Sequence, residues 1–203
     1  MVCPSYLADP SALIVIDTSV AINLLATRVS VPILEALSNR VVITEEVSFE
    51  LKTQRRVGVD NSNEVLELVN AHRIEMVRLG DVGMQHFESL VVGPASETLD
   101  DGEAATIAYG IETDAVALID ERKANRICTQ RFPQLHIGCT VSLLAHRSVR
   151  GVLGQERLSD AVYNALYHGR MRVLARDVEW VVSLIGPDRA ADCHSLPKSV
   201  RVR

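Results

Sequence analysis

The chain has 203 residues, of which 26 are acidic and 21 are basic, with a net charge of -5 and 47% hydrophobic residues. A chain of this length and apolar content can bury a sizeable core without disulfides or structural zinc, which excludes disorder over most of it. The acidic balance argues against the broad positive surface of bulk DNA-binding proteins, but it leaves room for nucleic acid at one local site.

Residues 1–11 are expected to form an N-terminal extension. They lack the basic and apolar regions of an export signal, and the apolar run over 12–16 is only as long as one buried strand. We therefore expect a cytoplasmic protein without a membrane span. Free thiols are expected because no C-x-x-C pair or zinc-ligand spacing occurs. The four cysteines are Cys3, Cys128, Cys139 and Cys193.

Short apolar runs alternate with segments of helical spacing from residue 12 onward. The apolar runs, typical of strands buried in a parallel sheet, are 12–16, 41–44, 74–79, 115–119 and 135–138. The helical segments are 19–25, 31–37, 45–55, 62–71, 83–90, 102–111 and 121–130. This alternation predicts an α/β fold with a mostly parallel sheet.

Only helical segments follow residue 138. They are 140–150, 158–168 and 176–185, each with a glycine just beyond it, the usual mark of a helix end. We therefore expect a sheet domain over 12–151, a helical C-terminal extension over 152–187 and a flexible tail over 188–203.

Four carboxylates lie where an open α/β sheet gathers its working groups, at the carboxyl ends of the strands. Asp17 and Asp120 directly follow the first and fourth strands. Glu50 lies on the helix after the second strand, and Glu103 lies in the first turn of the helix before the fourth. Each alone has a simpler explanation, which is helix capping for the aspartates, the helix dipole for Glu103 and a solvated helix face for Glu50.

Clustered together, these carboxylates would need a cation, because neighbouring negative charges raise one another's pKa. Oxygen ligands without His or Cys favour Mg²⁺ or Mn²⁺, ions that support phosphodiester hydrolysis. Other phosphate and nucleophile motifs are missing. There is no Walker loop, no G-x-G-x-x-G, no G-x-S-x-G, and Ser19 stands where an aspartyl-phosphate enzyme would carry a second Asp.

Five blocks of the sequence resemble motifs of the PIN-domain family, within its prokaryotic branch of toxin-like or predicted nucleic-acid-binding proteins. The blocks are DTSVAINL at 17–24, VVITEEVSFEL at 41–51, LDDGEAATIAYG at 99–110, ALIDERKANRI at 117–127 and IGCTVSLLAHRSVRGVL at 137–153. The resemblance extends over 13–186. It implies a three-layer fold with a five-stranded parallel sheet between helices, in which the ends of the first and fourth strands meet, plus a helical C-terminal extension.

The resemblance also implies an activity. Active members are similar in being Mg²⁺- or Mn²⁺-dependent endoribonucleases, often toxins restrained by an antitoxin protein and often homodimers. On this basis Asp17 and Asp120 would bind the metal, and Glu103 would bind it or its water. Glu50 would orient or deprotonate the attacking water.

Polar neighbours of these acids would support them. Thr18, Ser19 and Asn23 would hold the carboxylates in place, with helix capping and a solvated helix face as the alternatives. Asp100 or Asp101 would be close enough to Glu103 for either to join the metal site.

The charge changes sign just after Asp120, between Glu121 and Arg122. Residues 75–121 hold eleven acids and one base, whereas residues 122–157 hold seven bases and one acid. Arg122, Lys123 and Arg126 could bind RNA phosphates beside the metal, or they could form a solvated helix face that pairs with nearby acids.

The leading hypothesis is therefore a metal-dependent ribonuclease, the toxin of a toxin–antitoxin pair. The alternative is a non-catalytic interaction module that binds nucleic acid or a protein partner. An unbroken acidic set favours the enzyme.

Overall fold

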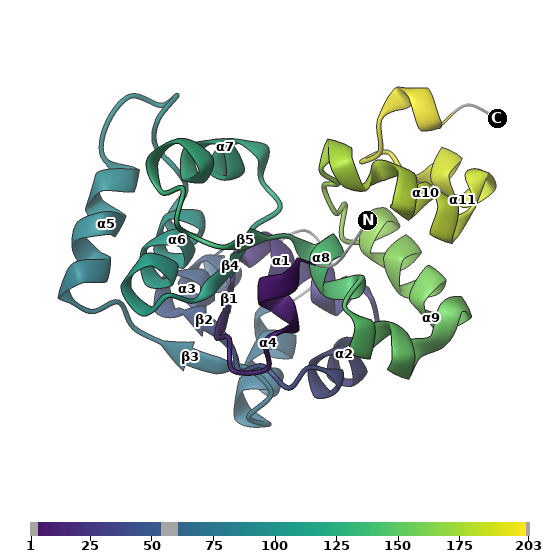
Figure 1. Ribbon diagram of the computed structural model, residues 1–203, viewed down its shortest axis with the longest axis horizontal. Helices are drawn as coiled ribbons and strands as arrows, with labels where there is room; N and C mark the ends of the chain where they lie inside the picture. The colour runs from purple at the N-terminus through teal and green to yellow at the C-terminus, as the bar shows by residue number, and fades with distance from the viewer. Residues whose placement is uncertain (1–3, 54–60, 202–203) are drawn as a thin grey trace.

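The computed structural model describes residues 4–53 and 61–201. At its centre lies a five-stranded sheet in the order β3-β2-β1-β4-β5, and every neighbouring pair is parallel (Figure 1). The strands are β1 (Ile14–Ile16), β2 (Val41–Thr44), β3 (Glu75–Val77), β4 (Val116–Leu118) and β5 (Ile137–Gly138). The predicted parallel α/β architecture is confirmed.

Helices cover both faces of the sheet because its central strands are apolar on both sides. Ile14 and Ile16 of β1 pack into one core region, and Val15 between them packs into the other. The first face carries α1 (Thr18–Ala26), α2 (Ser30–Ala36), α3 (Glu45–Thr53) and α4 (Asn61–Asn70). The second face carries α5 (Asp81–Val91), α6 (Asp101–Thr113) and α7 (Arg122–Arg131).

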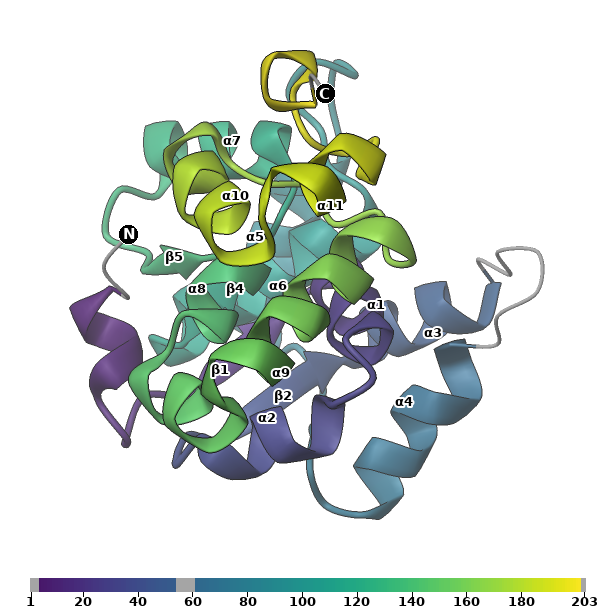
Figure 2. The same ribbon diagram turned by 90° about the vertical axis from the view of Figure 1, so that its right-hand side faces the viewer.

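The chain after β5 extends the first layer with helices. They are α8 (Thr140–Leu144), α9 (Arg147–Tyr167), α10 (Val178–Ile185) and α11 (Pro187–Asp192). Figure 2 shows these C-terminal helices from their outer side, and α9 packs against α1 and α2. The C-terminal helices thus share one core with the sheet domain.

Two sequence-based boundaries in this part are wrong. Gly151 does not end a helix, since α9 runs through it and breaks at Gly154, whose φ of 67° suits glycine. The segment 188–203, expected to be a flexible tail, folds through residue 201 as α11 and a 3-10 helix at Lys198–Val200. It is anchored by buried apolar side chains spaced three residues apart, at positions 190, 193 and 196.

The N-terminal extension also packs on the domain. It forms a 3-10 helix over Ser5–Ala8, with Leu7 buried in the core and the Tyr6 hydroxyl donating to the carbonyl oxygen of Ile137. Cys128, Cys139 and Cys193 are free, as predicted, and all three are buried. Cys3 lies outside the described residues.

Within residues 4–53 and 61–201, no single helix is long and apolar enough to cross a membrane. Only α1 and α2 taken together reach that length and composition, and they are bent by 112° relative to each other.

The strand order reverses beside β1. From β1 the chain moves outward through β2 to β3, and it then returns to β4 on the other side of β1 and moves out to β5. The crevice at the carboxyl ends of β1 and β4 is therefore the topological switch point, where open α/β sheets bind ligands.

Candidate active site

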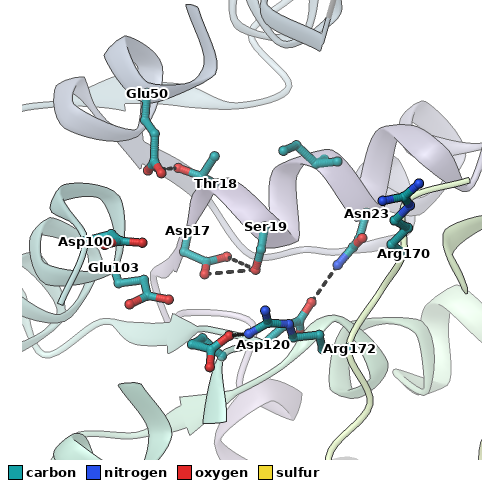
Figure 3. Close-up of a pocket in the computed structure, with 13 residues that line it drawn as sticks. Asp17, Thr18, Ser19, Asn23, Glu50, Asp100, Glu103, Asp120, Arg170 and Arg172 are labelled. Atoms are coloured by element: carbon teal, nitrogen blue, oxygen red, sulfur yellow. Dashed lines mark hydrogen bonds and ion pairs between the residues drawn. The ribbon is translucent and has the colours of Figure 1, made fainter. Parts of the chain in front are cut away.

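A pocket of about 200 Å³ opens at this switch point. It is lined by all four predicted acids and by four of the predicted supporting residues (Figure 3). These are Asp17, Glu50, Glu103, Asp120, Thr18, Ser19, Asn23 and Asp100. The structure thus brings together side chains that come from four separate parts of the sequence.

Asp17 both caps a helix and lines the pocket. It is the N-cap of α1, where its Oδ1 accepts a hydrogen bond from the backbone N–H of Val20 at 2.7 Å. The Ser19 hydroxyl lies 3.0 Å from both carboxylate oxygens, and its single hydrogen can serve only one of them at a time. Asp17 is 1% exposed. The capping bond uses Oδ1 and leaves acceptor capacity on Oδ2, so capping and ligand binding are compatible.

Asp120 is held rigidly from behind. It accepts hydrogen bonds from the Thr140 backbone N–H at 2.8 Å, the Thr140 hydroxyl at 2.6 Å and the Asn23 side-chain amide at 2.7 Å. It does not cap α7, whose N-cap position is Glu121. Asn23 is 3% exposed, which rules out the solvated helix face considered for it.

Thr140 was missed by the sequence analysis. It begins α8 after the fifth strand, a strand-end position comparable to those of Asp17 and Asp120. That position, directly after a strand of the parallel sheet, is the feature of the sequence that indicates Thr140.

Glu50 is fixed by a contact between helices. The Thr18 hydroxyl of α1 donates to Glu50 Oε2 of α3 at 2.6 Å. Gly102 of α6 lies against the same pair, and a Cβ at this position would collide with the Glu50 carboxylate and lie 2.7 Å from the Thr18 hydroxyl oxygen. The glycine in the LDDGEA block therefore lets α6 approach close enough to place Glu103 beside the other acids.

We expect Gly102→Ala to damage the site more than the fold. The added methyl group would displace the Glu50 carboxylate from Thr18, while alanine in a helix gains about 1 kcal/mol over glycine. The variant should lose most catalytic activity and keep its free energy of unfolding within about 1 kcal/mol, as measured by denaturant unfolding. Gly151→Ala is the matched control, since a Cβ there meets nothing within 4 Å. An active Gly102→Ala enzyme would contradict this role.

Burial and mutual repulsion raise the pKa values of three of the acids. Burial raises the pKa of Asp17 well above its usual range, and the negative charges of Asp120 and Glu103 raise it further. Burial, followed by the charge of Asp100, raises the pKa of Glu103 to about 7. Burial raises the pKa of Asp120 as well, opposed by its hydrogen bonds from Thr140 and Asn23. A bound cation would stabilise the ionised form of all three carboxylates.

This donor set fits a hydrated divalent ion. Among the described residues, no group of three Asp, Glu, His or Cys side chains is arranged to hold an ion by itself. Mg²⁺ characteristically retains several waters and uses one or two protein carboxylates together with substrate phosphate. Two buried carboxylates with spare acceptor capacity, Asp17 and Asp120, meet that requirement, and Glu103 lies close enough to affect the pKa of Asp17.

The basic residues predicted to bind RNA lie outside this pocket. Lys123 Nζ donates to the carbonyl oxygen of Ala95 at 2.6 Å, and Arg126 Nη2 donates to that of Ser96 at 3.0 Å. These two side chains therefore hold the loop between α5 and α6. Arg122 is exposed and does not line the pocket.

The basic side chains that do line the pocket are Arg170 and Arg172. They lie in the segment after α9, and the sequence analysis did not identify them. The sequence feature that indicates them is the alternation of arginine with small or apolar residues in GRMRV at 169–173, which is typical of an extended segment with one buried side.

A parallel sheet that presents buried carboxylates at its switch point is suited to binding a divalent metal ion. A family model described as a PIN domain matches residues 13–186, and the chain belongs to the PIN-domain family. PIN domains are generally nucleases and typically depend on divalent metal ions. No curated protein and no solved structure matches the chain significantly.

Proposed function

We propose that this protein is an Mg²⁺- or Mn²⁺-dependent endoribonuclease that hydrolyses phosphodiester bonds in RNA. One observation carries the proposal. Asp17 and Asp120, each 1% exposed, lie at adjacent strand ends with raised pKa values in an open pocket. Burying two such carboxylates costs stability, and the cost is explained if the site binds a cation.

The acidic side chains of the pocket would bind the metal ion, and their polar neighbours would orient them. Asp17 and Asp120 would hold the ion directly, with Glu103 binding it or one of its waters. When bound, the ion would polarise the phosphodiester and lower the pKa of a coordinated water. Asn23 and Thr140 keep Asp120 oriented toward the pocket, and their hydrogen bonds stabilise its ionised form.

Glu50 would orient the attacking water and accept its proton. The water oxygen would form a bond to phosphorus as the bond from phosphorus to the leaving oxygen breaks. The water proton would pass to the Glu50 carboxylate, and the leaving oxygen would take up a proton from solvent. Thr18 holds Glu50 by donating to one carboxylate oxygen, Oε2. Glu50 also lies at the pocket wall, on α3, whereas Asp17 and Asp120 follow strands and Glu103 lies on α6.

Metal dependence tests this proposal. We expect the purified protein to cleave RNA with Mn²⁺ or Mg²⁺, to lose cleavage when EDTA is added and to regain it with excess Mn²⁺. The assay is gel analysis of a fluorescently labelled RNA. Cleavage that persists in EDTA would contradict a metal-dependent mechanism, and no cleavage with either ion would favour a non-catalytic module.

We further propose that this ribonuclease is a cytoplasmic toxin, that an antitoxin protein inhibits it and that it acts as a homodimer. Resemblance to the toxin-like PIN branch supports this role. Induced expression in a bacterial host should arrest growth, and Asp17→Asn expressed to the same level should not. Equal arrest by both proteins, followed as colony counts after induction, would contradict toxicity by RNA cleavage.

A further inference from the structure

The segment between α9 and α10 forms one wall of the active-site pocket. Burial alternates along it, with Gly169, Met171 and Val173 buried, and Arg170 and Arg172 exposed. Met171 and Val173 belong to the core shared with the sheet domain, which anchors the segment. The two arginines between these anchors both line the pocket.

The segment packs closely against both the end of α9 and α1. A Cβ on Gly169 would lie 2.6 Å from the Ala165 carbonyl oxygen, 2.7 Å from Asn23 Oδ1 and 3.0 Å from the Ala26 Cβ, so only glycine fits without a shift. The next residue, Arg170, has a φ of 57°, a left-handed conformation that is uncommon for a residue with a side chain. Arg170 follows the end of α9, and this turn lies beside Asn23, the residue that holds Asp120.

The arginines lie across the pocket from Asp100 and Glu103. In Figure 3, Asp100 and Glu103 lie on one side of Asp17, while Arg170 and Arg172 lie on the other. Arg172 forms an ion pair with Glu121, which also lines the pocket. A guanidinium has five donors in a rigid fork, so Arg172 can pair with Glu121 and still donate to phosphate oxygens.

The charge balance of the pocket explains why these arginines matter. Its lining, which falls wholly within the described residues, contains six acids and two bases. RNA carries a negative charge at every phosphate, so its strand needs positive side chains beside the metal site. The basic residues of α7 are less suited to this, since none of Arg122, Lys123 and Arg126 lines the pocket.

We propose that Arg170 and Arg172 bind the backbone phosphates of the RNA strand next to the scissile bond. The C-terminal helical extension then completes the active site, because its connecting segment supplies the phosphate contacts. This inference rests on the proposed ribonuclease function.

The test compares Arg170→Gln and Arg172→Gln with the native protein in two assays. Binding of a fluorescein-labelled 12-nucleotide RNA is measured by anisotropy in EDTA, and kcat/KM for its cleavage is measured with Mn²⁺. Both assays are run over a series of KCl concentrations. Each variant should bind about tenfold more weakly and lose kcat/KM mainly through KM. Its log–log salt dependence should be shallower by about 0.7, the value for one phosphate contact on a single strand.

Arg40→Gln is the matched control. Arg40 also pairs with a glutamate, donating to Glu75 at 3.0 and 2.6 Å, but it precedes β2 at the opposite end of the sheet. It should leave both salt slopes unchanged. Arg172→Lys keeps the positive charge, so the salt dependence of its RNA binding should match that of the native protein. It should lose part of the RNA affinity, because lysine lacks the guanidinium fork.

The outcomes separate the two proposals. If the native protein cleaves RNA and the Arg170 and Arg172 variants keep native affinity, KM and salt slope, the arginine assignment is wrong and the ribonuclease stands. A shallower slope in Arg126→Gln alone would also overturn it, in favour of α7. If the native protein neither binds nor cleaves RNA, the ribonuclease proposal fails and the arginine assignment fails with it.

Discussion

Asp17→Asn should reduce RNA cleavage by at least about 10³-fold while making the metal-free protein more stable. The loss follows because a neutral amide is a poor ligand for Mg²⁺ or Mn²⁺ and no longer offsets the charge of the ion. The gain follows because the buried charge of Asp17, which is repelled by Asp120 and Glu103, disappears. Asparagine is as good an N-cap as aspartate, so the start of α1 should be preserved.

The measurements are initial rates of cleavage with Mn²⁺ and denaturant unfolding in EDTA at pH 8. The free energy of unfolding should increase by at least about 1 kcal/mol, the equivalent of roughly one pKa unit. Asp81→Asn is the control for the same chemical change at an exposed helix start, and it should alter neither quantity appreciably. An inactive Asp17→Asn that is also strongly destabilised would point to a structural role instead.

Stability of the metal-free protein should fall as pH rises from about 5 to 8. Glu103 has a folded-state pKa of about 7, above its ordinary value of 4.5, so the folded state binds more protons than the unfolded state between these values. Its contribution to stability is therefore complete below about pH 4 and is lost as pH rises through 7. Asp17 and Asp120, whose pKa values are also raised, act in the same direction.

The contribution of Glu103 to the stability of the metal-free protein, lost as pH rises, is about 3 kcal/mol at most. It is measured as the free energy of unfolding in EDTA over this pH range, and Glu103→Gln should flatten the curve. Glu88→Gln, which changes an exposed glutamate on α5, should leave the curve as steep as in the native protein. Saturating Mn²⁺ should also flatten it, because the ion displaces the protons, and Mn²⁺ affinity should rise with pH. A metal-free protein whose stability increases across this range would show that the acids are not coupled as described.

The fold was predictable where the local pattern and the global arrangement agree. Each apolar run of the central strands is buried on both faces, as the continuous hydrophobicity at 12–16 and 115–119 predicted. Asp17 and Asp120 could be placed together because strands that follow parallel crossovers end at the same edge of the sheet.

What sequence reasoning missed depends on contacts between distant segments. The hydrogen bond between Asn23 and Asp120 joins residues 97 positions apart, and nothing local distinguishes Asn23 from a solvated polar residue. Arg170 and Arg172 reach the pocket only because Met171 is buried and Gly169 fits against α1. The ordered C-terminal segment was missed because its apolar residues are few and are effective only when α9 and α10 are already packed.

The central claim is that Asp17 and Asp120 jointly hold a divalent cation, and the most direct measurement is anomalous diffraction from a crystal soaked in Mn²⁺. We predict a peak at the carboxyl ends of β1 and β4, about 2.1 Å from a carboxylate oxygen of Asp17 and at a similar distance from one of Asp120. The same soak of Asp17→Asn crystals should give a much weaker peak. A native crystal with no manganese between these two carboxylates would contradict the claim.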